Sequence, residues 1–170
     1  HYWVPVLTVV AVLTMFVGNF AALVQKDVKR ILGYSSIANA GYVMIAAITH
    51  GHDFRVGNGT IIYFLLSYTL MTIGAFAVVS LGAKNGKEGT KLEDLNGMWR
   101  RSPFAALALV LFMASLIGIP PTAGFVGKFL LFFDALRTDM MPLAIVLAIN
   151  SVISVYYYLA IARAAFVADS

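Results

Sequence analysis

Charged residues are scarce in this 170-residue chain, and cysteine is absent altogether. Asp, Glu, Lys and Arg make up 12% of the residues, whereas a soluble domain carries about 25%. Hydrophobic residues make up 61%, and the mean hydropathy is +0.86. The absence of cysteine excludes a disulfide framework and thiolate metal sites. The balance of apolar and charged residues indicates a protein adapted to lipid rather than to water.

The first residues lack the features of a signal peptide. His1 is followed closely by an apolar stretch, with no basic n-region and no small-residue cleavage site. We therefore expect the chain to be part of a longer protein, with further helices before and after it. The formal net charge is +4, but the basic residues fall mostly between the apolar stretches. This pattern is typical of membrane topology signals rather than of a nucleic-acid surface.

Five stretches are long and apolar enough to cross a bilayer, which requires about 20 such residues in a helix. They run over about 4–24, 31–49, 60–81, 103–133 and 142–166. A charged linker over 84–101 separates the third stretch from the fourth. The sequence therefore predicts an all-α polytopic membrane protein, with residues 1–170 forming a single transmembrane region of five helices.

The distribution of Lys and Arg among the connecting segments predicts the orientation of the chain. The connectors after the first and third spans carry most of these residues: Lys26, Lys29, Arg30, Lys84, Lys87, Lys91, Arg100 and Arg101. The alternate connectors carry Arg55 and Arg137. Because short basic loops stay on the cytoplasmic side, we expect the first span to run from outside to inside and the linker 84–101 to be cytoplasmic.

The fourth span is too long for one straight helix. Its 31 residues would measure about 46 Å at 1.5 Å per residue, against about 30 Å for the hydrocarbon core. Gly118, Pro120, Pro121 and Gly124 lie near its middle, and Pro121 removes a backbone donor and disfavours helix at Pro120. We expect a hinge here that breaks the span into two half-helices. Such backbone at membrane depth is typical of transport proteins.

Lys128 follows this break and is the principal candidate for a functional residue. Ionisable residues within membrane spans are costly, rare and usually functional, and a lysine can take up and release a proton. The competing interpretation is snorkelling, in which the apolar stem carries the amine to the headgroups. Phe133, where the predicted span ends, is five residues away, so both interpretations are open at this point.

Other polar residues have less specific patterns. His50, His52 and Asp53 resemble a loose metal cluster, but we expect them to be solvated residues of a loop outside the membrane. The tyrosines at 156–158 are expected to pack and anchor the last span rather than to line a channel. The predicted spans contain no histidine or carboxylate, so direct catalysis by this chain is disfavoured.

Uncharged polar residues are scattered along the spans. They are Asn19, Ser35, Ser36, Asn39, Ser67, Thr69, Thr72, Asn150 and Ser154. Most are expected to form hydrogen bonds between helices, and a minority to hold water in a proton path. The sequence does not distinguish the two groups.

Three stretches, read together, resemble one family. Residues 18–42, 116–129 and 156–159 are similar to the proton-translocating membrane subunits of bacterial respiratory complex I and of related cation/proton antiporters. The resemblance runs over nearly the whole chain. Members of this family have about fourteen helices, including two inverted repeats of five helices that each contain one broken helix. The resemblance implies that this chain is one inverted repeat of the antiporter-like fold, corresponding to helices nine to thirteen.

The same resemblance implies a role for Lys128. It matches the lysine that the family uses as the terminal proton-transfer residue on the outer side. The family also uses an intramembrane glutamate and lysine of the first repeat, which would precede this chain. We thus expect a subunit that couples electron transfer from NADH to quinone to proton pumping, as part of a translocase without a catalytic redox site on this chain.

Several further expectations follow from the resemblance. No cofactor or metal is expected on this chain, since NADH, FMN, iron–sulfur clusters and quinone would be bound by other subunits. The expected partners are other membrane subunits, including neighbouring antiporter-like ones, and the lipid bilayer, with no nucleic acid. The expected location is the bacterial inner membrane. Two alternatives are a subunit of a sodium/proton antiporter or membrane-bound hydrogenase, and a non-conducting membrane scaffold.

Overall fold

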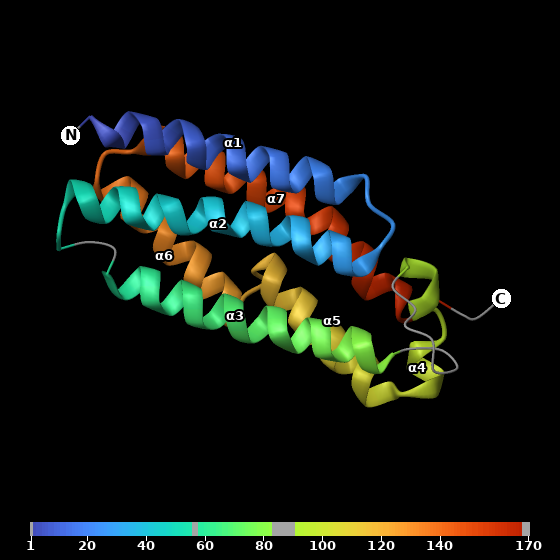
Figure 1. Cartoon of the computed structure of the whole chain (residues 1–170). Coiled ribbons are helices and arrows are strands. Elements are labelled where there is room, and N and C mark those ends of the chain that lie inside the picture. Colours follow the sequence, from blue (N-terminus) through green and yellow to red (C-terminus); the bar gives the residue numbers. More distant parts are fainter. Residues whose placement is uncertain (1, 56–57, 83–90, 168–170) are drawn as a thin grey trace.

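The computed structural model describes residues 2–55, 58–82 and 91–167, and these residues form a bundle of helices (Figure 1). The elements are α1 (Trp3–Leu23), α2 (Val28–His52), α3 (Asn58–Leu81), η1 (Leu92–Leu95), α4 (Met98–Arg101), α5 (Pro103–Ile117), α6 (Ala123–Arg137) and α7 (Met141–Ala164). The described part of the chain contains no strand of a sheet. The expected all-α fold is therefore confirmed.

Four of the described helices are long and apolar enough to cross a bilayer, namely α1, α2, α3 and α7. α5 is a shorter apolar helix of 15 residues. Length and composition thus indicate a multi-pass membrane protein. α5 and α7 each begin with a proline in the first turn, where a missing N–H leaves no hydrogen bond unmade.

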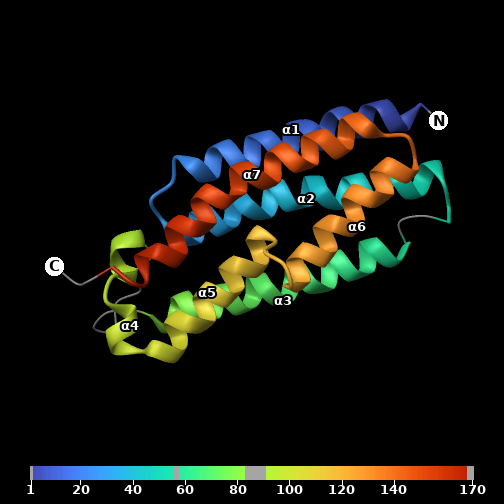
Figure 2. The same cartoon turned by 180° about the vertical axis from the view of Figure 1, so that it is seen from behind.

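The helices form two groups that run side by side (Figures 1 and 2). α1, α2 and α7 contact one another in one group, and α3, α5 and α6 contact one another in the other. α5 and α6 together extend along the bundle, and the break between them lies near its middle (Figure 2). α7 and α2 contact the second group, so helices flank the break, whereas Ile119, Pro120 and Pro121 within it are exposed.

α1 and α2 approach each other closely through small residues. A Cβ atom on Gly18 would lie 2.5 Å from the Ala38 backbone nitrogen and 2.9 Å from the Tyr34 carbonyl oxygen. One on Gly41 would overlap the Met15 side chain. Small residues permit such backbone approach between membrane helices, where packing rather than water drives association.

The basic residues gather at the end of the bundle where α1, α3 and α7 finish (Figure 1). We call this the basic end, and its described members are Lys26, Lys29, Arg30, Lys91, Arg100, Arg101 and Arg163. Lys84 and Lys87, which belong to the predicted linker, lie outside the described residues. The described part of that linker is not a plain loop, because it forms η1 and α4.

η1 and α4 are tied by backbone hydrogen bonds to helices on either side. The Leu92 N–H donates to the Lys26 carbonyl oxygen at 2.9 Å, and the Gly97 N–H to the Val167 carbonyl oxygen at 2.8 Å. Gly97 has a φ of 75°, which suits a residue without a side chain. These bonds fix the described part of the linker against the loop between α1 and α2 and against the end of α7.

α2 continues further than the sequence predicted. His50 and His52 lie in its last turn, so their assignment to a loop was wrong. The helix continues because the Asp53 N–H still bonds to the Thr49 carbonyl oxygen, at 2.9 Å. The Trp3 ring packs closely against Gly51, and the His50 ring packs edge-on against the Phe54 ring. Sequence periodicity does not reveal these contacts.

Candidate functional site

The break in the fourth predicted span runs from Gly118 to Thr122, between α5 and α6. Gly118 has a φ of +89°, in the left-handed region that glycine adopts without strain. The N–H groups of Gly118 and Ile119 both donate to the Ala114 carbonyl oxygen at 3.1 Å, and that of Gly118 also lies 3.1 Å from the Ser115 carbonyl oxygen. This is a glycine-capped helix end, and it precedes the two prolines that were expected to cause the break.

Lys128 donates hydrogen bonds to the remaining backbone carbonyls at the C-terminal end of α5. Its amine Nζ donates to the carbonyl oxygen of Leu116 at 2.9 Å and to that of Ile117 at 3.2 Å. The last four carbonyls of a helix have no partner within the helix. In α5, backbone N–H groups satisfy the first two of these carbonyls and Lys128 the last two. A lysine amine at this position also meets the negative end of the helix dipole.

The stem and amine of Lys128 point into the bundle. A Cβ atom on Gly118 would lie 3.3 Å from Lys128 Cδ, so the glycine provides the space through which the stem passes. The amine lies 5.6 Å from the centre of the Tyr42 ring, and Tyr42 is only 1% exposed. This arrangement differs from snorkelling, in which the amine would lie beyond the end of α6 among headgroups.

Gly124 lies in the first turn of α6 and not in the unwound segment where it was expected. A Cβ atom there would overlap the Ser115 carbonyl group of α5. The Gly124 N–H donates to Ser115 Oγ at 3.2 Å, and that hydroxyl donates to the Met71 sulfur at 2.6 Å. Thr122 caps the helix by accepting a hydrogen bond from the Phe125 N–H at 3.4 Å. The two half-helices thus meet at a site that only glycine fits.

Asp134 is a functional candidate that the sequence did not predict. It is 7% exposed in α6 and accepts a hydrogen bond from Thr60 Oγ1 at 2.6 Å. The predicted span ended at Phe133, where the apolar run stops, and the spans were expected to contain no carboxylate. α6 continues beyond that residue to Arg137, so Asp134 lies on the same helix as Lys128, and Thr60 of α3 donates a hydrogen bond to its carboxyl group. The signal available in the sequence was Asp134 itself, because it is an acidic residue directly after an apolar run.

A second polar cluster joins α1 and α7. The amide of Asn19 donates to Asn150 Oδ1 at 2.8 Å, and the Tyr157 hydroxyl donates to Asn19 Oδ1 at 2.7 Å. Asn19, Asn150 and Tyr157 are all at most 2% exposed. Tyr156, by contrast, is 69% exposed, so the three consecutive tyrosines do not share one role.

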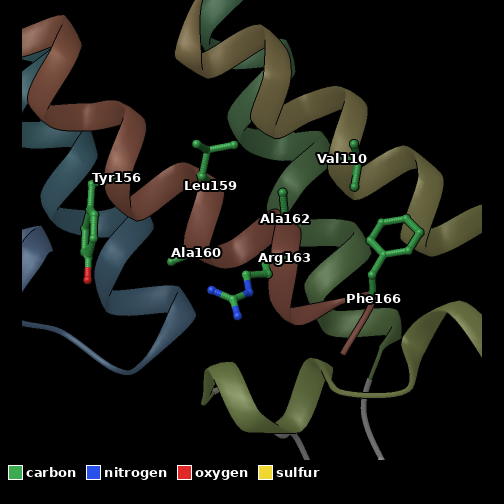
Figure 3. Close-up of a pocket in the computed structure, with 7 residues that line it drawn as sticks. All are labelled: Val110, Tyr156, Leu159, Ala160, Ala162, Arg163 and Phe166. Carbon is green, nitrogen blue, oxygen red and sulfur yellow. The ribbon is translucent and has the colours of Figure 1, made fainter. Parts of the chain in front are cut away.

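A surface groove of about 530 Å³ is lined by no residue of the break and not by Lys128. It lies between α5 and α7 near the basic end (Figure 3) and is lined by Val110, Tyr156, Leu159, Ala160, Ala162, Arg163 and Phe166. Most of these side chains are apolar, and Arg163 provides the one charge. Among the described residues, no three His, Asp or Glu side chains lie close enough to hold a metal ion. His50, His52 and Asp53 therefore gain no support as a metal site.

Comparison with known proteins matches residues 1–154 to the family described as NADH:quinone oxidoreductase/Mrp antiporter, TM. The chain belongs to this family. The match covers α1 to α6 and part of α7, including the break and Lys128. The resemblance expected from the sequence is thus confirmed.

Individual members of the NADH:quinone oxidoreductase/Mrp antiporter family are also similar to this chain. The NADH-quinone oxidoreductase subunit N of Trichlorobacter lovleyi is 48% identical over 157 residues, which cover 92% of this chain and 32% of that protein. The chain therefore spans about a third of the length of the curated relatives that it matches.

Solved structures show the same fold. A chain of respiratory complex I from Thermus thermophilus with bound aureothin is 39% identical, with a TM-score of 0.85 over 98% of this chain and 37% of that one. A chain of the Mrp complex from Dietzia sp. DQ12-45-1b is 25% identical, with a TM-score of 0.87 over 97% of this chain and 30% of that one. The antiporter-like fold is common to both.

Proposed function

We propose that this chain is part of the proton-translocating membrane subunit of a bacterial NADH:quinone oxidoreductase, and that Lys128 takes up and releases the translocated proton. Relatives named NADH-quinone oxidoreductase subunit N, 40–48% identical to this chain, support the assignment. The observation that carries it is the hydrogen bonding of the Lys128 amine to the last two carbonyls of α5.

The geometry suggests how a proton is held at this site. As an ammonium group, Lys128 has three N–H donors, of which the Leu116 and Ile117 carbonyls take two and a water molecule can take the third. Hydrogen bonds from a charged donor are stronger than those from a neutral one. Loss of the proton weakens the bonds that join α6 to α5, so the protonation state of Lys128 and the geometry of the hinge at Gly118–Thr122 depend on each other.

The proposal extends to the larger assembly. α5 and α6 together would make the fourth of five spans, and the chain would form one inverted repeat of the fold. The coupling to NADH oxidation, with FMN, iron–sulfur clusters and quinone held elsewhere, would come from other subunits of the complex in the bacterial inner membrane. Neighbouring antiporter-like subunits and lipid would contact the apolar outer faces of the helices.

Replacement of Lys128 in the complete complex tests the proposal. We expect Lys128→Met to lower the number of protons pumped per quinone reduced, because methionine keeps the length of the stem and removes the titrating group. Lys128→Arg serves as the matched variant, since arginine keeps the charge and holds its proton at all accessible pH values. Normal pumping with Lys128→Met would contradict the proposal.

A cation/proton antiporter is the second candidate, and the likeness to the Mrp complex chain favours it. Measurements on the same complex, reconstituted in vesicles, distinguish the two candidate functions. Proton pumping that depends on NADH and quinone supports the first candidate, whereas sodium gradients that move protons without electron transfer support the second. If the chain is a non-conducting scaffold, replacement of Lys128 should change neither proton pumping driven by electron transfer nor proton movement driven by sodium gradients.

A further inference from the structure

An exposed face of α7 carries two apolar grooves toward the basic end. One, of about 530 Å³, lies between α7 and α5, and its lining includes Val110 and Leu159 (Figure 3). The other, of about 360 Å³, lies between α7 and α1, and its lining includes Leu23 and Val152. Tyr156 lines both grooves and is 69% exposed. The Tyr156 ring therefore separates two apolar channels that run along the same helix.

The two grooves together extend through one leaflet of a membrane. Val152 lines the second groove and Arg163 lines the first, and about 16 Å of α7 separates them at 1.5 Å per residue. Half of a hydrocarbon core measures about 15 Å. Trp99 of α4 packs against Phe166, with 5.0 Å between the ring centres, and exposed tryptophan is typical of the membrane–water interface. Arg163 thus lies at the level of the headgroups when Val152 lies near the middle of the membrane.

Positive charge lies at the headgroup end of both grooves. The Arg163 guanidinium lines the first groove and has no carboxylate partner among the described residues. Lys26 lines an adjoining pocket of about 240 Å³, and Tyr156 contributes to that pocket as well. Glu93 shares a further pocket with Lys26 and Lys91, whose described charged lining is therefore net positive. Guanidinium groups bind phosphate with two parallel hydrogen bonds, so this end of the face suits a phosphate group.

We propose that this face of α7 binds one anionic diacyl phospholipid from the leaflet at the basic end. The two acyl chains lie in the two grooves, one on each side of the Tyr156 ring. The phosphate meets Arg163, with Lys26 on the side of the second groove. Acyl chains gain little by leaving other lipid, which is equally apolar, so the basic side chains determine which lipid binds. The site does not involve Lys128 and is independent of the proposed function.

A membrane helix is the competing occupant of the same face. Helices in membranes associate through small residues that let their backbones approach closely. Here the exposed Tyr156 ring lies between the two grooves. Flexible acyl chains can pass on either side of this ring, whereas a straight helix would have to lie over it. The Arg163 charge at one end of an apolar face also matches a phospholipid, whose charge lies at one end of its apolar chains.

Photochemical labelling tests the proposal. The complete membrane protein that contains this chain is reconstituted in phosphatidylcholine vesicles with a small fraction of phosphatidylglycerol that has a photoreactive acyl chain. Light links this lipid to the protein, and mass spectrometry of peptides locates the labels. We expect labels on the α7 peptide that contains Tyr156. Arg163→Gln should lower this labelling about fivefold at subsaturating lipid, because a basic residue near a membrane surface contributes an attraction of this size.

Three further variants show whether the effect is specific. Arg163→Lys keeps the charge and should retain most of the labelling. Addition of Lys26→Gln to Arg163→Gln should lower the labelling further. Arg55→Gln is the matched control, since it removes an exposed basic residue that follows α2, at the other end of the bundle from Arg163, and it should be labelled normally. Equal labelling of all the proteins would overturn the site.

A second lipid separates a selective site from general contact with the bilayer. Phosphatidylcholine with the same photoreactive chain should label the α7 peptide less, and its labelling should not depend on Arg163. Equal labelling by the two lipids would overturn the proposal, because the basic residues would then select nothing. Absence of any label on this peptide would mean that protein covers the face, and it would overturn the proposal in favour of a helix.

Discussion

The Lys128 amine and the Leu116 carbonyl oxygen lie 2.9 Å apart, so a side chain of α6 completes the hydrogen bonding of α5. The two half-helices are therefore joined by a titratable group and not by backbone alone. The passage of the Lys128 stem beside Gly118, and the closeness of Gly124 to Ser115, are both needed for this arrangement. Each of these contacts leads to a measurable prediction.

Gly118→Ala should destabilise the break by about 1–2 kcal/mol, because a residue with a Cβ atom is strained at a φ of +89°. The added methyl group would also press on the Lys128 stem. We expect a lower midpoint of thermal inactivation of the complex and slower proton pumping. Gly118→Asn is the matched variant, since asparagine adopts this conformation more readily than alanine. Its midpoint of thermal inactivation should lie between that of the unmodified complex and that of the Gly118→Ala variant. Equal midpoints for all three proteins would contradict the prediction.

Gly124→Ala should be more damaging than its size suggests. The new Cβ atom would overlap the Ser115 backbone, which cannot rotate away as a side chain can, and overpacking of this kind costs about 1–3 kcal/mol. Gly59→Ala is the control, since the Cβ position at Gly59 has nothing within 4 Å. The amount of assembled complex in membranes should fall for the first variant and stay unchanged for the second.

Thr60 and Asp134 should be energetically coupled. Thr60→Val leaves the buried carboxylate without its 2.6 Å hydrogen bond and should cost about 1–3 kcal/mol. Asp134→Leu removes the carboxylate, and the double variant should be less destabilised than the sum of the single variants. Thermal inactivation of all four proteins measures the coupling. Simple additivity would show that the contact contributes nothing to stability.

Gly18→Val should disrupt the contact between α1 and α2. The Cβ position lies 2.5 Å from the Ala38 backbone nitrogen, so the helices must separate to admit any side chain. Gly33→Ala, also on this pair of helices, meets nothing within 4 Å and should be tolerated. Protease resistance of the subunit in membranes compares the two. A resistant Gly18→Val protein would mean that the approach is less tight than described.

Much of the architecture was predictable because lipid imposes simple rules on sequence. Apolar runs locate α1, α3 and α7, and the prolines at 120 and 121 indicate the break. The details that depend on contacts between distant segments were not predictable. Asp134 is satisfied by a threonine 74 residues away, and the end of α2 at His52 is held by packing against Trp3. Periodicity contains no information on either partner.

The site was predictable in part for the same reason. Lys128 is visible in the sequence because a charge inside an apolar run is unusual. Its partners are backbone carbonyls of Leu116 and Ile117, which carry no sequence signal.

The short η1–α4 segment has a mechanical consequence. Leu92 is bonded to the α1–α2 loop through Lys26, and Gly97, five residues later, is bonded to Val167 just after α7. Because so short a stretch of compact backbone can extend little, the segment holds Lys26 and Val167 at a nearly fixed separation. A shift of α7 along its axis would pull on the α1–α2 loop, and the ends of three helices would move as a unit.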